Sequence, residues 1–196
     1  MTKWLATWLQ WTLLGFGLGC LGTVGYATLE AQRFEQAQTV RFAHAVPDAT
    51  AGTIRVRPGD TVGVLSMPRV GLSTAVVEGD DAESLKKSAG HLPDTPWPWD
   101  AGNSAIAGHR DGRFRALRHV QVGDEIRLQT RRGELLYTVK ELSIVEPDDL
   151  SVLRPREAAS LTLITCYPFN YLGNAPQRFI VRAERVTALA SATAPR

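Results

Sequence analysis

The chain has 196 residues, of which 44% are hydrophobic, and its 22 basic and 20 acidic side chains leave a formal charge of only +2. This length and composition allow one domain with its own core plus an N-terminal extension, and they exclude a wholly disordered chain. The arginines are scattered along strand-like segments and form no basic block with interleaved aromatics, so nucleic acid is not an expected partner.

The N-terminal 29 residues predict a membrane anchor. Residues 4–29 carry no charge and are mostly apolar, and at about 1.5 Å rise per residue they can form a helix that spans a hydrocarbon core of roughly 30 Å. Lys3 precedes this segment, which favours a cytoplasmic N-terminus. We therefore expect a single-pass protein anchored in membrane lipid, with the rest of the chain facing outward.

Two alternatives to a retained anchor have less support. A cleaved signal peptide would need an Ala-x-Ala site directly after the apolar run, and none is present there. A lipoprotein cysteine at Cys20 would need an aliphatic residue three positions earlier, where the chain has Gly17. We expect no disulfide between Cys20 and Cys166, because one thiol would lie in lipid and the other in the folded domain.

Beyond the anchor, residues 30–52 predict a stalk, residues 53–188 the main domain and residues 189–196 a tail. The domain contains several short runs of alternating or continuous apolar residues, which are typical of strands. The predicted strands cover residues 62–67, 72–78, 104–108, 125–130, 134–145, 160–166 and 178–186. Short helices are predicted at 81–88 and 113–120. Seven or eight short strands indicate an all-β domain closed into a barrel, because such a domain must hide its edges.

One strand ends on a cysteine that is a candidate nucleophile. Leu161 to Cys166 forms an apolar run, and side-chain alternation puts Cys166 on the same face as Ile164, opposite Thr165. A thiolate attacks carbonyl carbon well, but a free thiol is mostly protonated at neutral pH. For a cysteine taken alone, inert burial is the more common role, so further residues must decide.

A histidine and an arginine supply the rest of the expected chemistry. His109 follows an apolar run upstream, and Arg178 comes twelve residues after the cysteine (178 − 166 = 12). An imidazolium favours the thiolate and can protonate a departing amine. A guanidinium is always charged and can steady an oxyanion or orient a substrate backbone. Taken alone, His109 is equally consistent with a turn residue and Arg178 with a solvated strand residue.

The surrounding segments resemble the sortase family of bacterial cysteine transpeptidases through nearly the whole domain. The matching segments are Gly59-Asp60 and residues 67–72, 102–103, 107–111, 114–117, 122–124, 161–169 and 175–179. Within the family the chain is most similar to class D, because of the Thr-Cys-Tyr-Pro-Phe run at 165–169 and the Ala-Pro-Gln-Arg-Phe run at 175–179. The resemblance implies a seven- or eight-stranded sortase-like barrel on the outer side of the bacterial cytoplasmic membrane.

The resemblance also implies a role for each candidate residue. Cys166 would form a thioacyl intermediate with the threonyl carbonyl of a Leu-Pro-x-Thr-Gly-like sorting signal. His109 would act as acid and base, Arg178 would steady the substrate and the oxyanion, and Thr165 would help line the substrate groove. The implied partners are surface proteins that carry a C-terminal sorting signal, and an amine of the cell wall or of a protein subunit as acceptor.

Several other residues have side chains that can bind metal, act in catalysis or line a binding site. The acidic residues between 78 and 83 lack the spacing of a calcium loop, so no metal and no cofactor are expected. His91 is predicted to lie in a helix-to-loop transition and to take no part in catalysis. The segment from Thr95 to Asp100 departs from the plainer turn expected in the family. Its Trp97 and Trp99 either shape an acceptor site or pack on the barrel.

Two other functions stay open from the residues alone. A cysteine enzyme acting on peptidoglycan peptides would use the same three residue types, but it would normally carry a histidine close to the cysteine. Here the two are 57 positions apart (166 − 109 = 57). A barrel that binds a peptide without cleaving it is the non-enzymatic alternative.

Overall fold

Eight strands close into a barrel in the computed structural model, which describes residues 4, 8, 10–23, 25–26, 56–171 and 173–186. The chain divides into two units, residues 1–37 and 38–196, and each is described by itself. In the first unit residues 10–23 are helical. Within the described residues, no helix combines the length and hydropathy needed to cross a membrane. The predicted stalk and tail lie outside the described residues.

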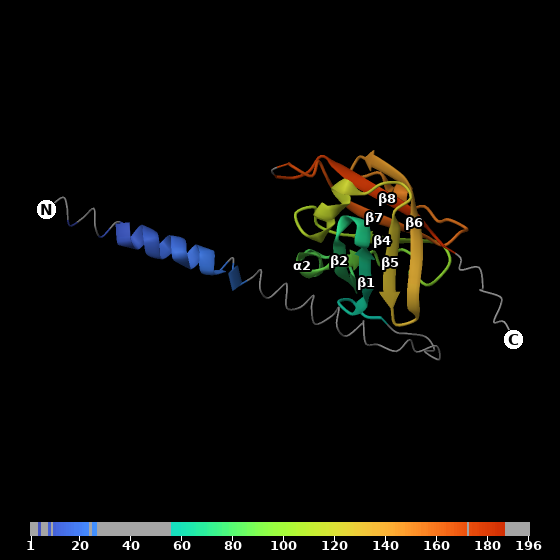
Figure 1. Cartoon of the computed structure of the whole chain (residues 1–196), viewed down its shortest axis with the longest axis horizontal. Helices are drawn as coiled ribbons and strands as arrows, with labels where there is room; N and C mark the ends of the chain where they lie inside the picture. The colour runs from blue at the N-terminus through green and yellow to red at the C-terminus, as the bar shows by residue number, and fades with distance from the viewer. Residues whose placement is uncertain are drawn as a thin grey trace. The chain divides into compact units, whose positions relative to one another are not determined.

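Figure 1 shows the barrel, whose strands form both parallel and antiparallel pairs. Its strands are β1 (Thr61–Met67), β2 (Leu72–Glu78), β3 (Ala89–His91), β4 (Asn103–Ala107), β5 (Glu125–Thr130), β6 (Gly133–Val145), β7 (Ser160–Tyr167) and β8 (Gln177–Arg185). They are joined in the order β1-β2-β3-β4-β7-β8-β6-β5. The β2–β3 and β4–β7 pairs are parallel. Strand β7, which carries the candidate cysteine, pairs with β4 on one side and with β8 on the other.

The barrel interior follows from side-chain alternation. In β5, Ile126, Leu128 and Thr130 are buried while Glu125 and Arg127 are exposed, which is the period of two that a half-buried strand requires. In β7, Leu161 and Leu163 are fully buried. They join one continuous core cluster with the buried side chains of the other strands. The predicted all-β barrel is therefore confirmed, and it has eight strands.

The connecting helices are short. They are α2 (Ala82–Lys87) and the 3₁₀ helices η1 (Pro68–Val70), η2 (Arg113–His119) and η3 (Leu150–Leu153). The predicted helix at 113–120 corresponds to η2. It buries Phe114 and Leu117, which are three residues apart and so lie on the same side of a 3₁₀ turn.

The predicted place of His91 in a helix-to-loop transition was wrong, because this residue belongs to strand β3. β3 has only three residues, which is too short for alternation to be seen in the sequence. Its position depends on its neighbours: it pairs in parallel with β2 and in an antiparallel way with β4. η1 and η3 were also not predicted.

A buried carboxylate ties η1 to the turn between η2 and β5. Arg69 donates through Nε and Nη2 to the two carboxylate oxygens of Asp124, and its Nη2 also donates to the carbonyl of His119 at 2.6 Å. The Asp124 carboxylate accepts a further bond from the backbone N–H of Gln121 at 2.8 Å. The hydrogen bond from Arg69 lowers the pKa of Asp124 below its usual value.

This pairing predicts a pH-dependent stability. The pKa of Asp124 is lower in the folded state than in the unfolded state. Its ionised carboxylate therefore stabilises the fold at pH values above the unfolded pKa of about 3.9, and this stabilisation is lost as the pH falls through the folded pKa. We expect Asp124→Asn to lower the Tm by roughly 5 °C at pH 7 and by much less at pH 3. Thermal unfolding followed by circular dichroism tests this, with the exposed Asp148→Asn as control. An equal Tm difference at both pH values would contradict it.

Candidate active site

The end of β7 and the start of β8 bring two of the three candidate residues together. Cys166 and Arg178 are direct partners in the antiparallel β7–β8 register. Directly paired residues of antiparallel strands project from the same face, with Cβ atoms about 4.5–5.5 Å apart. The inner residues Leu163 and Thr165 alternate with them, so Cys166 and Arg178 lie on the outer face of the barrel. Both side chains are half-buried.

The parallel β4–β7 ladder carries His109 to the same end of the barrel. Every β4–β7 pair has the same offset, from Asn103↔Ser160 to Ala107↔Ile164 (164 − 107 = 57). His109 and Cys166 are separated by that same number (166 − 109 = 57). The contact continues one residue past β4, because the Gly108 N–H donates to the carbonyl of Ile164 at 3.1 Å. The residue before His109 is thus bonded to Ile164, two positions before Cys166 on β7, and the side chain of His109 is exposed.

Thr165 fastens this arrangement from the inner face. Its side chain is 2% exposed, and its hydroxyl donates to the carbonyl of Gly108 at 2.8 Å. The threonine therefore links the strand that holds Cys166 to the residue that precedes His109. Its predicted role in lining the groove stays a prediction.

Gly108 has a packing reason to be glycine. A Cβ at this position would lie 2.7 Å from the ring of Phe114, which is closer than van der Waals contact allows. The ring is buried at 1% exposure in the first turn of η2. The absence of a side chain therefore lets η2 pack directly under the segment that leads to His109.

Three aromatic rings support the Cys166–Arg178 pair. Tyr167 and Phe179 each follow one of the paired residues, and Phe169 lies in the loop after β7. Phe169 contacts Tyr167 with ring centroids 5.9 Å apart and Phe179 at 5.3 Å, both edge to face. Edge-to-face pairs at these distances are favourable beyond the area that they bury. The strand ends are thus held by a small apolar cluster continuous with the core.

Arg178 is oriented by one carbonyl group of the β7–β8 loop and one of β8 itself. Its Nη1 donates to the carbonyl of Ala175 at 3.3 Å and to that of Gln177 at 3.0 Å. No carboxylate neutralises this guanidinium within the described residues, since no ion pair involves it.

The next arginine after the histidine also reaches this loop. Arg110 is 6% exposed, and its guanidinium donates to the carbonyls of Pro168 at 3.1 Å, Tyr171 at 2.6 Å and Gly173 at 3.0 Å. No role was predicted for this residue. Its burial depends on how the two loops meet, which no local pattern in the sequence indicates.

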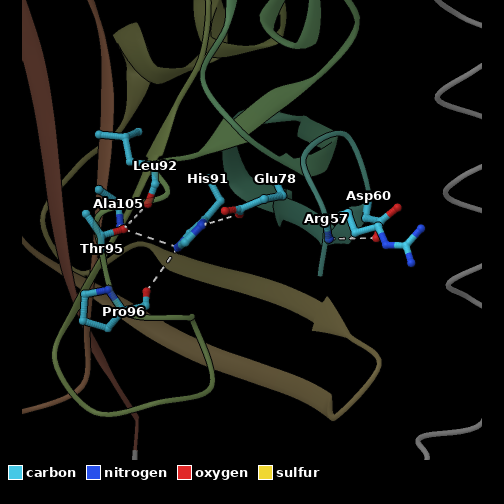
Figure 2. A network of polar contacts seen from close by, with 8 residues as sticks. All are labelled: Arg57, Asp60, Glu78, His91, Leu92, Thr95, Pro96 and Ala105. Carbon is cyan, nitrogen blue, oxygen red and sulfur yellow. Dashed lines mark hydrogen bonds and ion pairs between the residues drawn. The ribbon is translucent and has the colours of Figure 1, made fainter. Parts of the chain in front are cut away.

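His91 is held in a separate buried network (Figure 2). Figure 2 shows its ring between Glu78 on one side and Pro96 with Thr95 on the other. Nδ1 lies 2.7 Å from the Glu78 carboxylate and Nε2 lies 3.1 Å from the Pro96 carbonyl. Both ring nitrogens are engaged, so His91 is a structural residue, consistent with its predicted exclusion from catalysis.

The two tryptophans of the unusual loop extend this network. Trp97 stacks on His91 with centroids 4.7 Å apart, and Trp99 stacks on Trp97 at 5.3 Å. Both are partly buried against the core. Of the two roles considered for them, this geometry supports packing on the barrel.

The barrel closes around a parallel β4–β7 pair and holds a cysteine in register with an arginine at one strand end, which are residue types suited to thiol-dependent acyl transfer. The sortase domain family profile matches residues 65–186. The chain is 40% identical over 130 residues to Sortase D of Bacillus subtilis, an alignment that covers 66% of each protein. It therefore belongs to the sortase family, whose members are cysteine transpeptidases.

Solved structures give the same result. The Sortase D5 transpeptidase of Clostridium perfringens superposes with a TM-score of 0.68 at 25% identity, covering 80% of this chain and 98% of that one. Sortase C of Clostridium perfringens, solved with the C-terminal cell wall sorting motif, superposes with a TM-score of 0.62 at 25% identity, covering 74% and 81%. The chain spans about two thirds of the length of the Bacillus relative.

Proposed function

We propose that this chain cleaves a Leu-Pro-x-Thr-Gly-like sorting signal and transfers the new acyl group to an amine of the cell envelope or of a protein subunit. The observation that carries the proposal is the direct pairing of Cys166 with Arg178 at the β7–β8 edge. The β4–β7 register, which ends two residues before His109, supports this histidine as the acid–base group. The sorting motif in the sortase C structure from Clostridium perfringens supports this substrate class.

In the proposed first half-reaction, the thiolate of Cys166 attacks the threonyl carbonyl carbon and a C–S bond forms. The carbonyl oxygen takes up the negative charge, which the Arg178 guanidinium stabilises. The threonyl–glycyl C–N bond then breaks, and the His109 imidazolium gives its proton to the departing amine. A thioester on Cys166 and a neutral imidazole remain.

The second half-reaction reverses these roles. An acceptor amine attacks the thioester carbonyl while His109 takes a proton from its nitrogen, and the C–S bond breaks to return the thiolate. A new amide joins the acyl group to the acceptor. The reaction needs only the peptide substrate and the acceptor amine, because neither half-reaction includes an oxidation or a reduction.

We also propose that residues 1–29 anchor the chain in the bacterial cytoplasmic membrane, with residues 30–52 as stalk, residues 53–188 as the catalytic domain outside and residues 189–196 as tail. The uncharged run at 4–29 supports this. Fractionation of cells that express the full chain tests it. The protein should resist alkaline carbonate extraction of membranes, and recovery in the carbonate-soluble fraction would contradict the proposal.

The test of the reaction is to incubate the purified full-length chain with a Leu-Pro-x-Thr-Gly peptide and a glycine or lysine amine. Intact-protein mass spectrometry should find the enzyme heavier by the mass of the acyl fragment, and digestion with peptide mapping should locate this mass on the enzyme fragment that contains Cys166. A ligated product should accumulate. Bound peptide without an adduct would support the non-catalytic barrel instead. An adduct formed only with peptidoglycan stem peptides would support the alternative substrate.

A further inference from the structure

We propose that Arg110 is a positioning residue that holds the loop between β7 and β8 and, through this loop, keeps Arg178 beside Cys166. The inference rests on the proposed function and adds a residue to the site. Arg110 follows His109 directly in the chain. It therefore joins the segment that delivers the histidine to the loop that connects the cysteine strand with the arginine strand.

The first step is the unusual environment of this guanidinium. Arg110 is 6% exposed, and burying a charge is unfavourable unless its hydrogen-bonding groups are paired. Asp111 is the carboxylate that faces it, at 3.4 Å, but the Asp111 side chain is 77% exposed. An ion pair with so exposed a partner contributes little to stability. The buried charge is compensated mainly by backbone carbonyl groups.

The carbonyl groups that accept from Arg110 lie close together in the chain. All three belong to the β7–β8 loop, at Pro168, Tyr171 and Gly173. Nη1 and Nη2 both take part, and the guanidinium carbon also lies 5.8 Å from the centroid of the Tyr171 ring. Such a planar fork fixes several points of a loop at once, which a lysine ammonium does less well. One side chain thus restrains most of the first half of this loop.

The third step connects the loop to the site. Arg178 Nη1 donates to the carbonyl of Ala175, two residues beyond the last carbonyl held by Arg110. The two guanidinium groups are therefore linked through a short stretch of backbone. If the loop moves, one of the two carbonyl groups that orient Arg178, that of Ala175, moves with it. Misplacement of a catalytic group by about 1 Å can reduce a rate about 10²-fold.

The test compares Arg110→Met with a matched arginine at the other end of β8. Arg185 also donates to a proline carbonyl, that of Pro98, and also lies 5.8 Å from a tyrosine centroid, that of Tyr137. We expect Arg110→Met to lower kcat for peptide transfer by about 30- to 100-fold with KM changed less than threefold. Arg185→Met should keep kcat within threefold of wild type.

A double-mutant cycle distinguishes an effect of Arg110 on the position of Arg178 from a general loss of enzyme structure. If Arg110 acts through Arg178, Arg110→Met should lower kcat by less than about threefold in an Arg178→Ala background. Full additivity of the two losses would overturn the inference. So would a wild-type kcat in Arg110→Met, or an equal loss in Arg185→Met.

A readout that does not need activity keeps the inference distinct from the proposed function. Amide hydrogen exchange in the loop between β7 and β8 should accelerate about tenfold or more in Arg110→Met and stay unchanged in Arg185→Met. Unchanged exchange would overturn the inference even if wild type is active, whereas an inactive wild type with accelerated exchange in the variant would sink only the proposed function. If Arg110→Met does not fold, Arg110→Lys decides: accelerated exchange supports the inference, and wild-type exchange overturns it.

Discussion

Replacing Cys166 with alanine is expected to abolish both the covalent adduct and the ligated product. Without the thiol no C–S bond can form, and loss of the nucleophile in comparable acyl-transfer sites lowers kcat by roughly 10⁶-fold. The substitution removes one sulfur from a half-buried position at a strand end, so the barrel should keep its Tm within a few degrees. Intact-protein mass spectrometry and chromatography of the product measure the two losses.

The second cysteine provides a matched control. Cys20 is a free thiol in the N-terminal unit, and Cys20→Ala should form the adduct and product at wild-type rates. An adduct that persists in Cys166→Ala, or that maps to Cys20, would refute the assignment of the nucleophile.

Replacing His109 with alanine is expected to lower kcat by about 10²- to 10⁴-fold, the usual contribution of a positioned general acid and base. The departing amine would then have to leave without a proton donor. The side chain is exposed, and none of the hydrogen bonds found in the described part of the chain uses its ring, so the fold should be unaffected. Steady-state transfer kinetics and circular dichroism test the two parts of this expectation.

The control for His109 is another exposed histidine of the barrel. His119 ends η2, and its ring accepts a hydrogen bond from Arg118 Nε at 2.9 Å. His119→Ala keeps the backbone carbonyl that Arg69 uses and should retain the wild-type kcat. If both variants lose activity equally, or if His109→Ala remains fully active, His109 is not the acid–base residue.

Much of the fold follows from local patterns. The predicted ranges 72–78 and 125–130 coincide with β2 and β5, because β5 alternates buried and exposed residues and β2 is a short, almost wholly buried run, and both patterns are visible in a short window. β3 could not be predicted in this way. Its three residues are extended because β2 and β4 bind them on both sides, and such pairing has no signature in a short window.

The candidate site divides along the same line. Cys166, His109 and Arg178 could be selected from the residue types and the segments around them. Their arrangement could not, because the partner of a strand in a closed barrel is decided by residues far away in the chain. The separation of 57 between His109 and Cys166 (166 − 109 = 57) indicates that they are neighbours only because every β4–β7 pair has the same offset. Arg110 lies within the matching segment 107–111, but its residue type alone indicates no role.

The sequence by itself determined the strand segments of the barrel, the position of a thiol at a strand end and the family to which the chain belongs. These are properties of side-chain alternation and of short segments, and they are encoded locally. The tertiary structure alone decided that Cys166 faces Arg178, that His91 is enclosed with Glu78 and that Arg110 is buried against the β7–β8 loop. Those contacts join residues that meet only when strands pair and loops pack on one another, because buried hydrogen-bonding groups find their partners there.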